Sequence, residues 1–232
     1  MTDREFKQSI AKAYNFFRQM GIEKSFIHGY SLPVSQPFNS IALDTNSPYP
    51  DVFYQGLKLS HFNFNLQDYS YFQFSFNGPE DLRYAFYPSP FGPGDHAEIK
   101  DLTIGFEEGL IDQEEFEFAL QGLKNNYARP LLRYEYNSNQ YKSGCHPASH
   151  LHLGTFGEDR WTIHKKLTPY VFALIIAKHY FGEHWEAITE FDVAGIRLSN
   201  EFDMNLFREK TECSITPVHM FTDHETRGFY FL

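Results

Sequence analysis

Apolar residues recur at helical spacing near the start of the chain. Thr2 and Glu5 have the spacing of a capping box, in which each side chain accepts a hydrogen bond from the other residue's backbone. The apolar positions after them share one face of a helix: Phe6, Ile10, Ala13, Tyr14 and Phe17. The pattern therefore predicts an amphipathic helix over residues 3–20.

Two later segments carry similar helix signals. Residues 168–169 are Thr-Pro, and a capping hydroxyl followed by proline at the first helical position marks a helix start. The apolar run that follows predicts a buried helix ending near Trp185. Asp112 and Glu115 form another capping-box pair, which predicts a shorter helix to about Asn126.

Strands are predicted where apolar and polar residues alternate. The clearest case is a hairpin whose strands join through a turn at residues 67–70. The expected strands are 62–66, 71–76, 82–87, 131–136 and 150–153, with weaker candidates at 213–218 and 229–231. Because strands and helices do not alternate as βαβ units, we expect an α+β fold with an antiparallel or mixed sheet and helices packed mainly on one face.

Stretches rich in proline and glycine separate these elements. Residues 33–50 contain four prolines and little periodicity, which predicts a loop with one short strand near residues 41–43. Residues 88–96 combine prolines with glycines and predict a flexible loop. We expect the 232 residues, of which 42% are hydrophobic, to form one α+β domain that spans residues 1–232.

Composition narrows the setting and the partners. The formal net charge of −10 argues against a constitutive nucleic-acid-binding module, because Lys and Arg contacts to phosphates supply most non-specific affinity. An enzyme with one local basic pocket stays compatible with that charge. Cys145 and Cys213 lie far apart and predict neither a disulfide framework nor a zinc finger. The first residues are polar, unlike those of a signal peptide. The longest apolar stretch, residues 170–176, is too short to cross a membrane. We therefore expect a cytoplasmic protein without a membrane span.

The segment from His146 to Gly154 concentrates the candidate chemistry. If it is a strand, His150 and His152 share one face and Leu151 points into the core. Residues two apart on a strand lie roughly 6 to 7 Å from each other, so both imidazoles reach one substrate atom or one metal ion. The sequence has no phosphate loop, dinucleotide fingerprint or nucleophile elbow. The expected cofactor is therefore either none or an unknown divalent metal.

The strand before this segment brings further polar groups toward the histidines. Depending on the register, Arg133 or Tyr134 lies beside them. Three interpretations stay open. The two strand histidines act as base and acid with an arginine that binds an anionic group; or they hold a metal whose third ligand is His146, Glu135 or a distant acid; or they make structural hydrogen bonds only.

Residues 131–169 also resemble a known bacterial family. The segments Leu132-Arg-Tyr-Glu-Tyr-Asn137 and His146-Pro-Ala-Ser-His-Leu-His-Leu-Gly154, with Arg160 and Leu167-Thr-Pro after them, look like the family called domain of unknown function 2290. The likeness extends over most of the chain. More weakly, the chain resembles TumE-like proteins proposed as toxins of toxin–antitoxin pairs, with Arg133, Tyr134, Asn137 and the three clustered histidines at matching positions. This second likeness implies a prokaryotic stress or phage-defence setting.

The leading hypothesis from the sequence is a small hydrolase of a phosphodiester, with RNA as the first substrate. His150 and His152 would be base and acid, Arg133 would bind the phosphate, and His146 and Tyr134 would orient the substrate. One alternative is a non-enzymatic interaction or regulatory subunit of a defence or toxin–antitoxin system, bound to a protein partner or to a second copy of itself. The other is a metal-dependent hydrolase that uses the strand histidines, with His146 as a further ligand.

Overall fold

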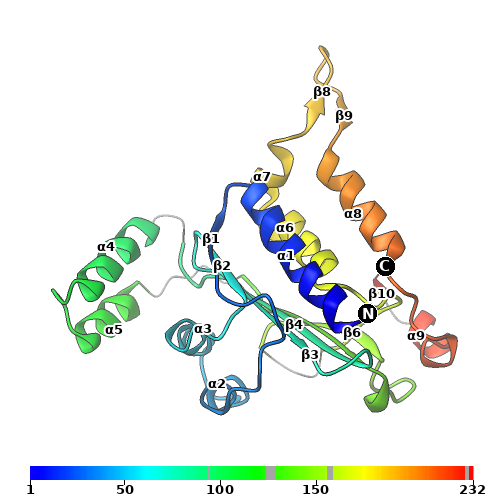
Figure 1. The fold of residues 1–232 in the computed structure, drawn as a ribbon, viewed down its shortest axis with the longest axis horizontal. Coiled ribbons are helices and arrows are strands. Elements are labelled where there is room, and N and C mark those ends of the chain that lie inside the picture. Colours follow the sequence, from blue (N-terminus) through cyan, green and yellow to red (C-terminus); the bar gives the residue numbers. More distant parts are fainter. Residues whose placement is uncertain (93–94, 124–128, 156–158, 228–229, 232) are drawn as a thin grey trace.

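The computed structural model describes residues 1–92, 95–123, 129–155, 159–227 and 230–231. Its helices, labelled as in Figure 1, are α1 (Asp3–Gln19), α2 (Gln36–Ala42), α3 (Tyr49–Lys58), α4 (His96–Glu107), α5 (Gln113–Gly122), α6 (Pro169–Tyr180), α7 (Gly182–Glu186), α8 (Glu201–Glu212) and α9 (Asp223–Arg227), with short 3-10 turns at Ser138–Gln140 and Val218–Met220. Its strands are β1 (Glu23–Phe26), β2 (Phe64–Leu66), β3 (Tyr71–Phe76), β4 (Asp81–Tyr87), β5 (Leu132–Asn137), β6 (Ser149–Leu153), β7 (Trp161–Ile163), β8 (Glu190–Phe191), β9 (Arg197–Ser199) and β10 (Tyr230–Phe231).

A mixed sheet forms the centre of the fold. Its strand order is β1-β2-β3-β4-β5-β6-β7-β10, and the first seven strands pair antiparallel. The last strand, β10, joins β7 in parallel. Apart from that strand, sheet order follows chain order, as expected for a meander of antiparallel strands. The predicted α+β class with an antiparallel or mixed sheet is confirmed.

Helices α1 and α6 cover one face of this sheet (Figure 1). The main core between them is rich in aromatic rings, with Phe17 at 5.2 Å from Phe72 and Phe172 at 6.3 Å from Phe74, measured between ring centroids. The predicted capping box of α1 is present: the Thr2 amide donates to Glu5 at 2.7 Å and the Glu5 amide donates to Thr2 at 3.3 Å. This layer is the one that the helical periodicity of the sequence indicates.

The opposite face of the sheet has two parts, one covered by helices and one that carries polar side chains. Helices α2 and α3 pack against the part near β3 and β4, where Tyr71 and Tyr87 stack at 4.7 Å between ring centroids. Farther along the sheet, strands β5 and β6 place charged and imidazole side chains on this same face, since every second residue of a strand points to one side. The candidate chemistry therefore lies on the face away from α1 and α6.

The predicted loop with a strand near residues 41–43 is wrong, because α2 and α3 occupy residues 36–42 and 49–58. Three of the four prolines that indicated a loop, Pro37, Pro48 and Pro50, sit at the starts of these helices, where the missing amide hydrogen costs nothing. Ser35 caps α2 by accepting a hydrogen bond from the Phe38 amide at 3.4 Å. Proline at a helix start and proline in a loop look alike in a short polar sequence.

The expected loop at residues 88–96 is shorter and better packed than the sequence suggested. Ser89 and Phe91 are buried, and α4 begins at His96. Residues 93–94 lie outside the described residues, as do residues 124–128, which include the predicted end of the helix at Asn126.

Three expectations about the second half need correction or completion. The helix predicted over residues 169–185 is interrupted at Phe181, which separates α6 from α7. Residues 213–218 do not form a strand; Ile215 makes a single antiparallel bridge with Lys165. The final strand is confirmed at residues 230–231, whereas residue 229 lies outside the described part of the chain.

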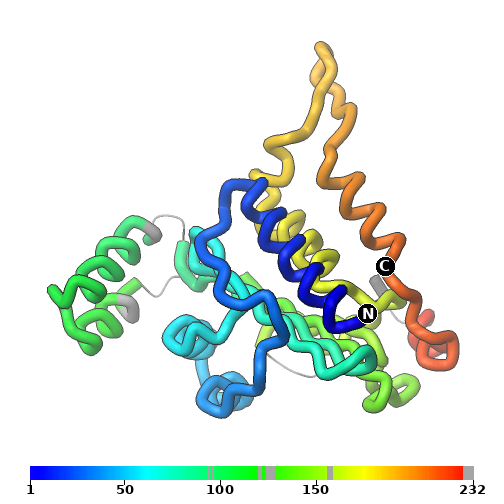
Figure 2. The backbone as a smooth tube through the Cα atoms, viewed as in Figure 1, coloured from blue at the N-terminus to red at the C-terminus, as the bar shows by residue number. Residues whose placement is uncertain are grey.

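Two parts of the chain extend away from the sheet. Strands β8 and β9 form a separate hairpin that connects the end of α7 to the start of α8 and projects from the sheet (Figure 2). Helices α4 and α5 form a second projection. Neither was predicted from the sequence as a projecting unit. Among the described residues, no helix has both the length and the apolar character that a membrane crossing requires.

Candidate functional site

The β5–β6 pair settles the register that the sequence leaves open. Arg133 lies directly opposite His152, and Glu135 lies directly opposite His150. Side chains of such directly opposed residues are neighbours across the two strands. The four residues therefore form one square on the sheet face away from α1 and α6, with two histidines on one strand and an arginine and a carboxylate on the other.

His150 is held in one tautomer by the chain before it. The side chain is fully buried, and its ring Nδ1 lies 2.8 Å from the carbonyl oxygen of Pro147. A carbonyl only accepts hydrogen bonds, so Nδ1 carries the hydrogen and Nε2 presents a lone pair. That Nε2 atom is buried and has no hydrogen-bond partner among the described residues. The geometry matches metal-binding histidines, whose second nitrogen donates to a carbonyl that fixes the ring.

His152 and Glu135 complete a compact group of ligand atoms. The Nε2 atom of His152 lies 4.0 Å from Oε1 of Glu135, and the histidine is 5% exposed by side chain against 26% for the carboxylate. One ligand atom from each of Glu135, His150 and His152 lies within 4.8 Å of the other two. Two imidazoles and one carboxylate are a ligand set of catalytic zinc and non-haem iron sites.

Burial keeps both strand histidines uncharged near neutral pH. Burial lowers the pKa of His150 to about 4, with a further lowering by the neighbouring His146. Burial and then the charge of Arg133 lower the pKa of His152 to about 3. Arg160 also lowers the pKa of both rings. Neutral imidazole is the form that binds a metal, so the electrostatics fit a pair of ligands better than an acid–base pair.

His146 lies at the edge of this group. Its ring centroid is 5.0 Å from that of His150, but its nitrogens are outside the set of mutually close ligand atoms. The segment that carries it is tied down: His146 and Lys142 exchange backbone hydrogen bonds of 2.8 and 2.9 Å, and the Gly144 amide donates to Glu225 at 3.3 Å. Gly144 has a φ of 73°, which glycine adopts without strain. His146 is thus placed beside His150 rather than opposite the carboxylate.

Tyr134 does not join the other predicted site residues. It alternates to the opposite face of β5, is fully buried in the main core, and its hydroxyl accepts a hydrogen bond from the Leu167 amide at 2.9 Å. Burial raises the pKa of Tyr134 well above its ordinary value, so the hydroxyl stays protonated. This position, on the face of β5 away from the histidines, does not fit the expected role of Tyr134 in orienting a substrate. Glu135, which the sequence offered as one of three choices for a third ligand, lies on the face that carries the two histidines.

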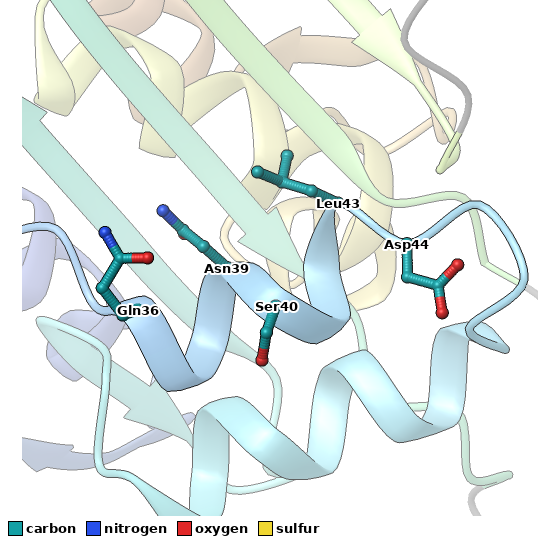
Figure 3. A pocket seen from close by; sticks show the side chains of 5 residues that line it. All are labelled: Gln36, Asn39, Ser40, Leu43 and Asp44. Carbon is teal, nitrogen blue, oxygen red and sulfur yellow. The ribbon is translucent and has the colours of Figure 1, made fainter.

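Two open depressions on the surface are lined by residues outside the square. One of about 510 Å³ is lined by Gln36, Asn39, Ser40, Leu43 and Asp44 of α2 and the turn after it (Figure 3). Another, of about 500 Å³, lies between the start of α1, the start of α6 and the end of α8. Neither is lined by the residues of the square, whose two histidines are buried.

Comparison with known proteins gives one finding. The family model described as "Uncharacterized conserved protein (DUF2290)" matches residues 15–231. No curated protein and no solved structure gives a significant match. The match spans the sheet, the β5–β6 pair and the square on it. The chain belongs to the DUF2290 family of conserved proteins.

Proposed function

We propose that this protein is a divalent-metal-dependent hydrolase of phosphodiester bonds, with Glu135, His150 and His152 as the metal ligands. One observation carries the proposal: one ligand atom from each of the three residues lies within 4.8 Å of the other two, and the Nε2 atom of His150 is buried without a hydrogen-bond partner among the described residues. When bound, a metal in such a three-ligand site supplies an activated water and neutralises charge on a phosphoryl oxygen.

The lowered pKa values weigh against the simpler alternative of metal-free acid–base catalysis. That mechanism needs one histidine to hold a proton at working pH and to give it to the leaving group. With pKa values of about 4 and about 3, His150 and His152 are both unprotonated on their acceptor nitrogens at neutral pH. The same two shifts favour metal binding, because the metal competes with no proton there.

RNA is the first substrate to test. The chain as a whole is acidic and repels polynucleotides, so a local excess of positive charge at the site has to offset that repulsion. The likeness to TumE-like toxins also favours RNA and a role in bacterial stress or phage defence. His150 and His152 are nearly inaccessible to solvent, so the part of the protein that covers them has to move before a polynucleotide reaches them.

The test is RNA cleavage by the purified protein after removal of metal with a chelator. We expect the chelated protein to cleave no RNA. Cleavage is expected to recover on addition of one equivalent of Zn²⁺ or Mn²⁺, because the metal would supply the activated water that attacks the phosphodiester bond. A dinucleotide substrate, assayed beside a longer RNA, separates slow access from slow chemistry. The His150→Ala/His152→Ala variant is the matched control.

Two results would count against the proposal. Cleavage that survives chelation at full rate would show that no metal takes part in the reaction. A protein that binds the metal at these three residues but cleaves neither RNA would place the function outside phosphodiester hydrolysis.

A further inference from the structure

Unpaired buried polar atoms are concentrated around the square of β5 and β6. Among the described residues, ten buried side-chain nitrogen or oxygen atoms lack a hydrogen-bond partner, and five of them belong to four neighbouring side chains: two atoms of Arg133 and one each of His146, His150 and His152. A buried donor or acceptor left without a partner costs roughly 1 to 3 kcal/mol, and more when the group is charged. Such a concentration indicates a place where a ligand supplies the partners.

The two unpartnered atoms of Arg133 form one edge of its guanidinium group. They are Nε and Nη2, which are both N–H donors and are permanently charged. No ion pair of the described residues involves Arg133, and its neighbour on β4 is the small Ala85. Two parallel N–H donors in a fixed plane match two oxygens of a phosphate group. The edge is therefore equipped to hold an oxyanion, and no oxygen of the described residues accepts a hydrogen bond from its two donors.

The guanidinium edge of Arg133 lies beside the proposed metal ligands, and its charge acts on them. Arg133 lies opposite His152 in the strand pair, and its charge is felt at His152, at His150 and at Tyr87. With both histidines neutral, Glu135 is the acid within the square, and it balances a single positive charge. The arginine and a divalent cation together exceed that charge by two units, so an anion completes the balance.

We propose that the Nε–Nη2 edge of Arg133 is a binding site for a phosphate group of the substrate, and that it binds this group without the metal. The inference rests on the proposed function for its biological meaning, because it names the part of the substrate that the same site holds. Its physical basis is separate, since the metal ligands are Glu135, His150 and His152.

The experiment is titration of the chelator-treated protein with inorganic phosphate, followed by calorimetry and by the NMR signals of the arginine Nε–H groups. We expect saturable binding and a shift of one signal that is missing in the Arg133→Lys variant. Arg133→Lys keeps the charge but loses the paired donors, and we expect affinity to fall about tenfold or more, the loss of one charge-assisted hydrogen bond. Arg133→Gln, which also loses the charge, is expected to bind more weakly still.

Arg83→Gln is the matched control. Arg83 is on β4, directly opposite Glu135 of β5, and shares the sheet face of the square. Its side chain is about half exposed and forms an ion pair with Asp81 at 3.3 Å. We expect its removal to leave the phosphate affinity within about twofold, as for a surface ion pair. Far-ultraviolet circular dichroism and the unfolding midpoint of each variant show whether it is folded.

The outcomes separate this inference from the proposed function. Absence of phosphate binding to the wild-type protein would overturn the inference. So would a phosphate affinity of the folded Arg133→Lys and Arg133→Gln variants equal to that of the wild type. Phosphate binding that requires Arg133, in a protein that takes up no Zn²⁺, would leave the inference standing and remove the proposed metal centre. Zn²⁺ uptake by Arg133→Gln with loss of phosphate binding is the result that both proposals predict.

Discussion

Replacing Glu135 with glutamine is expected to weaken Zn²⁺ binding at least 100-fold and to abolish metal-dependent cleavage. The substitution keeps the size of the side chain but removes the one negative charge in the ligand group. Loss of a residue that merely orients a ligand already costs about 10- to 100-fold in metal affinity, so loss of a ligand's charge costs at least as much. Competition with a chromophoric chelator measures the affinity, and RNA cleavage at saturating metal measures the activity.

Glu114→Gln is a suitable control for this comparison. Glu114 is an exposed acid in the first turn of α5, so its neutralisation changes the net charge equally without touching the square. Zinc affinity within about threefold of the wild type in Glu135→Gln, a difference too small for a lost ligand, would show that Glu135 does not bind the metal.

Acid is expected to destabilise the metal-free protein already between pH 7 and pH 5. The pKa values of His150 and His152 are lowered in the folded state to about 4 and about 3, below the ordinary value of 6.5. In this pH range the unfolded chain therefore binds protons that the folded chain does not, and stability falls as the pH falls. Each histidine contributes about 2 kcal/mol to the loss between pH 7 and pH 5.

Urea unfolding of chelator-treated protein at pH 7, 6 and 5 measures this effect. The His150→Gln/His152→Gln variant has no imidazole at these positions and is expected to show a flatter dependence over the same range. Carboxyl groups with lowered pKa values, such as those of Asp203 and Glu225, lose their contribution only at lower pH, so they do not obscure the comparison. An equal slope for the wild type and the variant would mean that the two histidines are protonated in the folded protein.

Much of the helical layer and of the central strands could be predicted from the sequence. Helix α1 has a capping box, an apolar face and a glycine after its end, and each of these signals agrees with the others. Helix α6 has the Thr168 cap and a proline at its first position. The strands around the β3–β4 hairpin alternate clearly because one of their faces packs against the main core.

Other elements were missed because their signals are local and ambiguous. The prolines near α2 and α3 occupy helix starts, which a sequence of this kind does not distinguish from turns. The hairpin of β8 and β9 exposes Phe191, Val193 and Leu198, so its apolar residues follow no buried face. Strand β8 has only two residues, too few for a period to be visible.

The candidate site was predictable in part. Alternation along a strand was enough to place His150 and His152 on one face, and the structure bears this out. The partner strand was a different problem, since shifting the register by one residue would exchange Arg133 and Glu135 for Tyr134. The long connection of residues 138–148 gives no short turn that would fix this register. The sheet pairing was therefore needed to choose Glu135 among the three candidates for the third ligand.

The central claim is that Glu135, His150 and His152 hold one divalent metal ion. The most direct test is the number of zinc ions retained per chain after reconstitution and desalting, measured by mass spectrometry for the wild type and for His150→Ala/His152→Ala. The account predicts close to one ion per wild-type chain and almost none for the folded variant. Zinc retained equally by both proteins, or by neither, would contradict it.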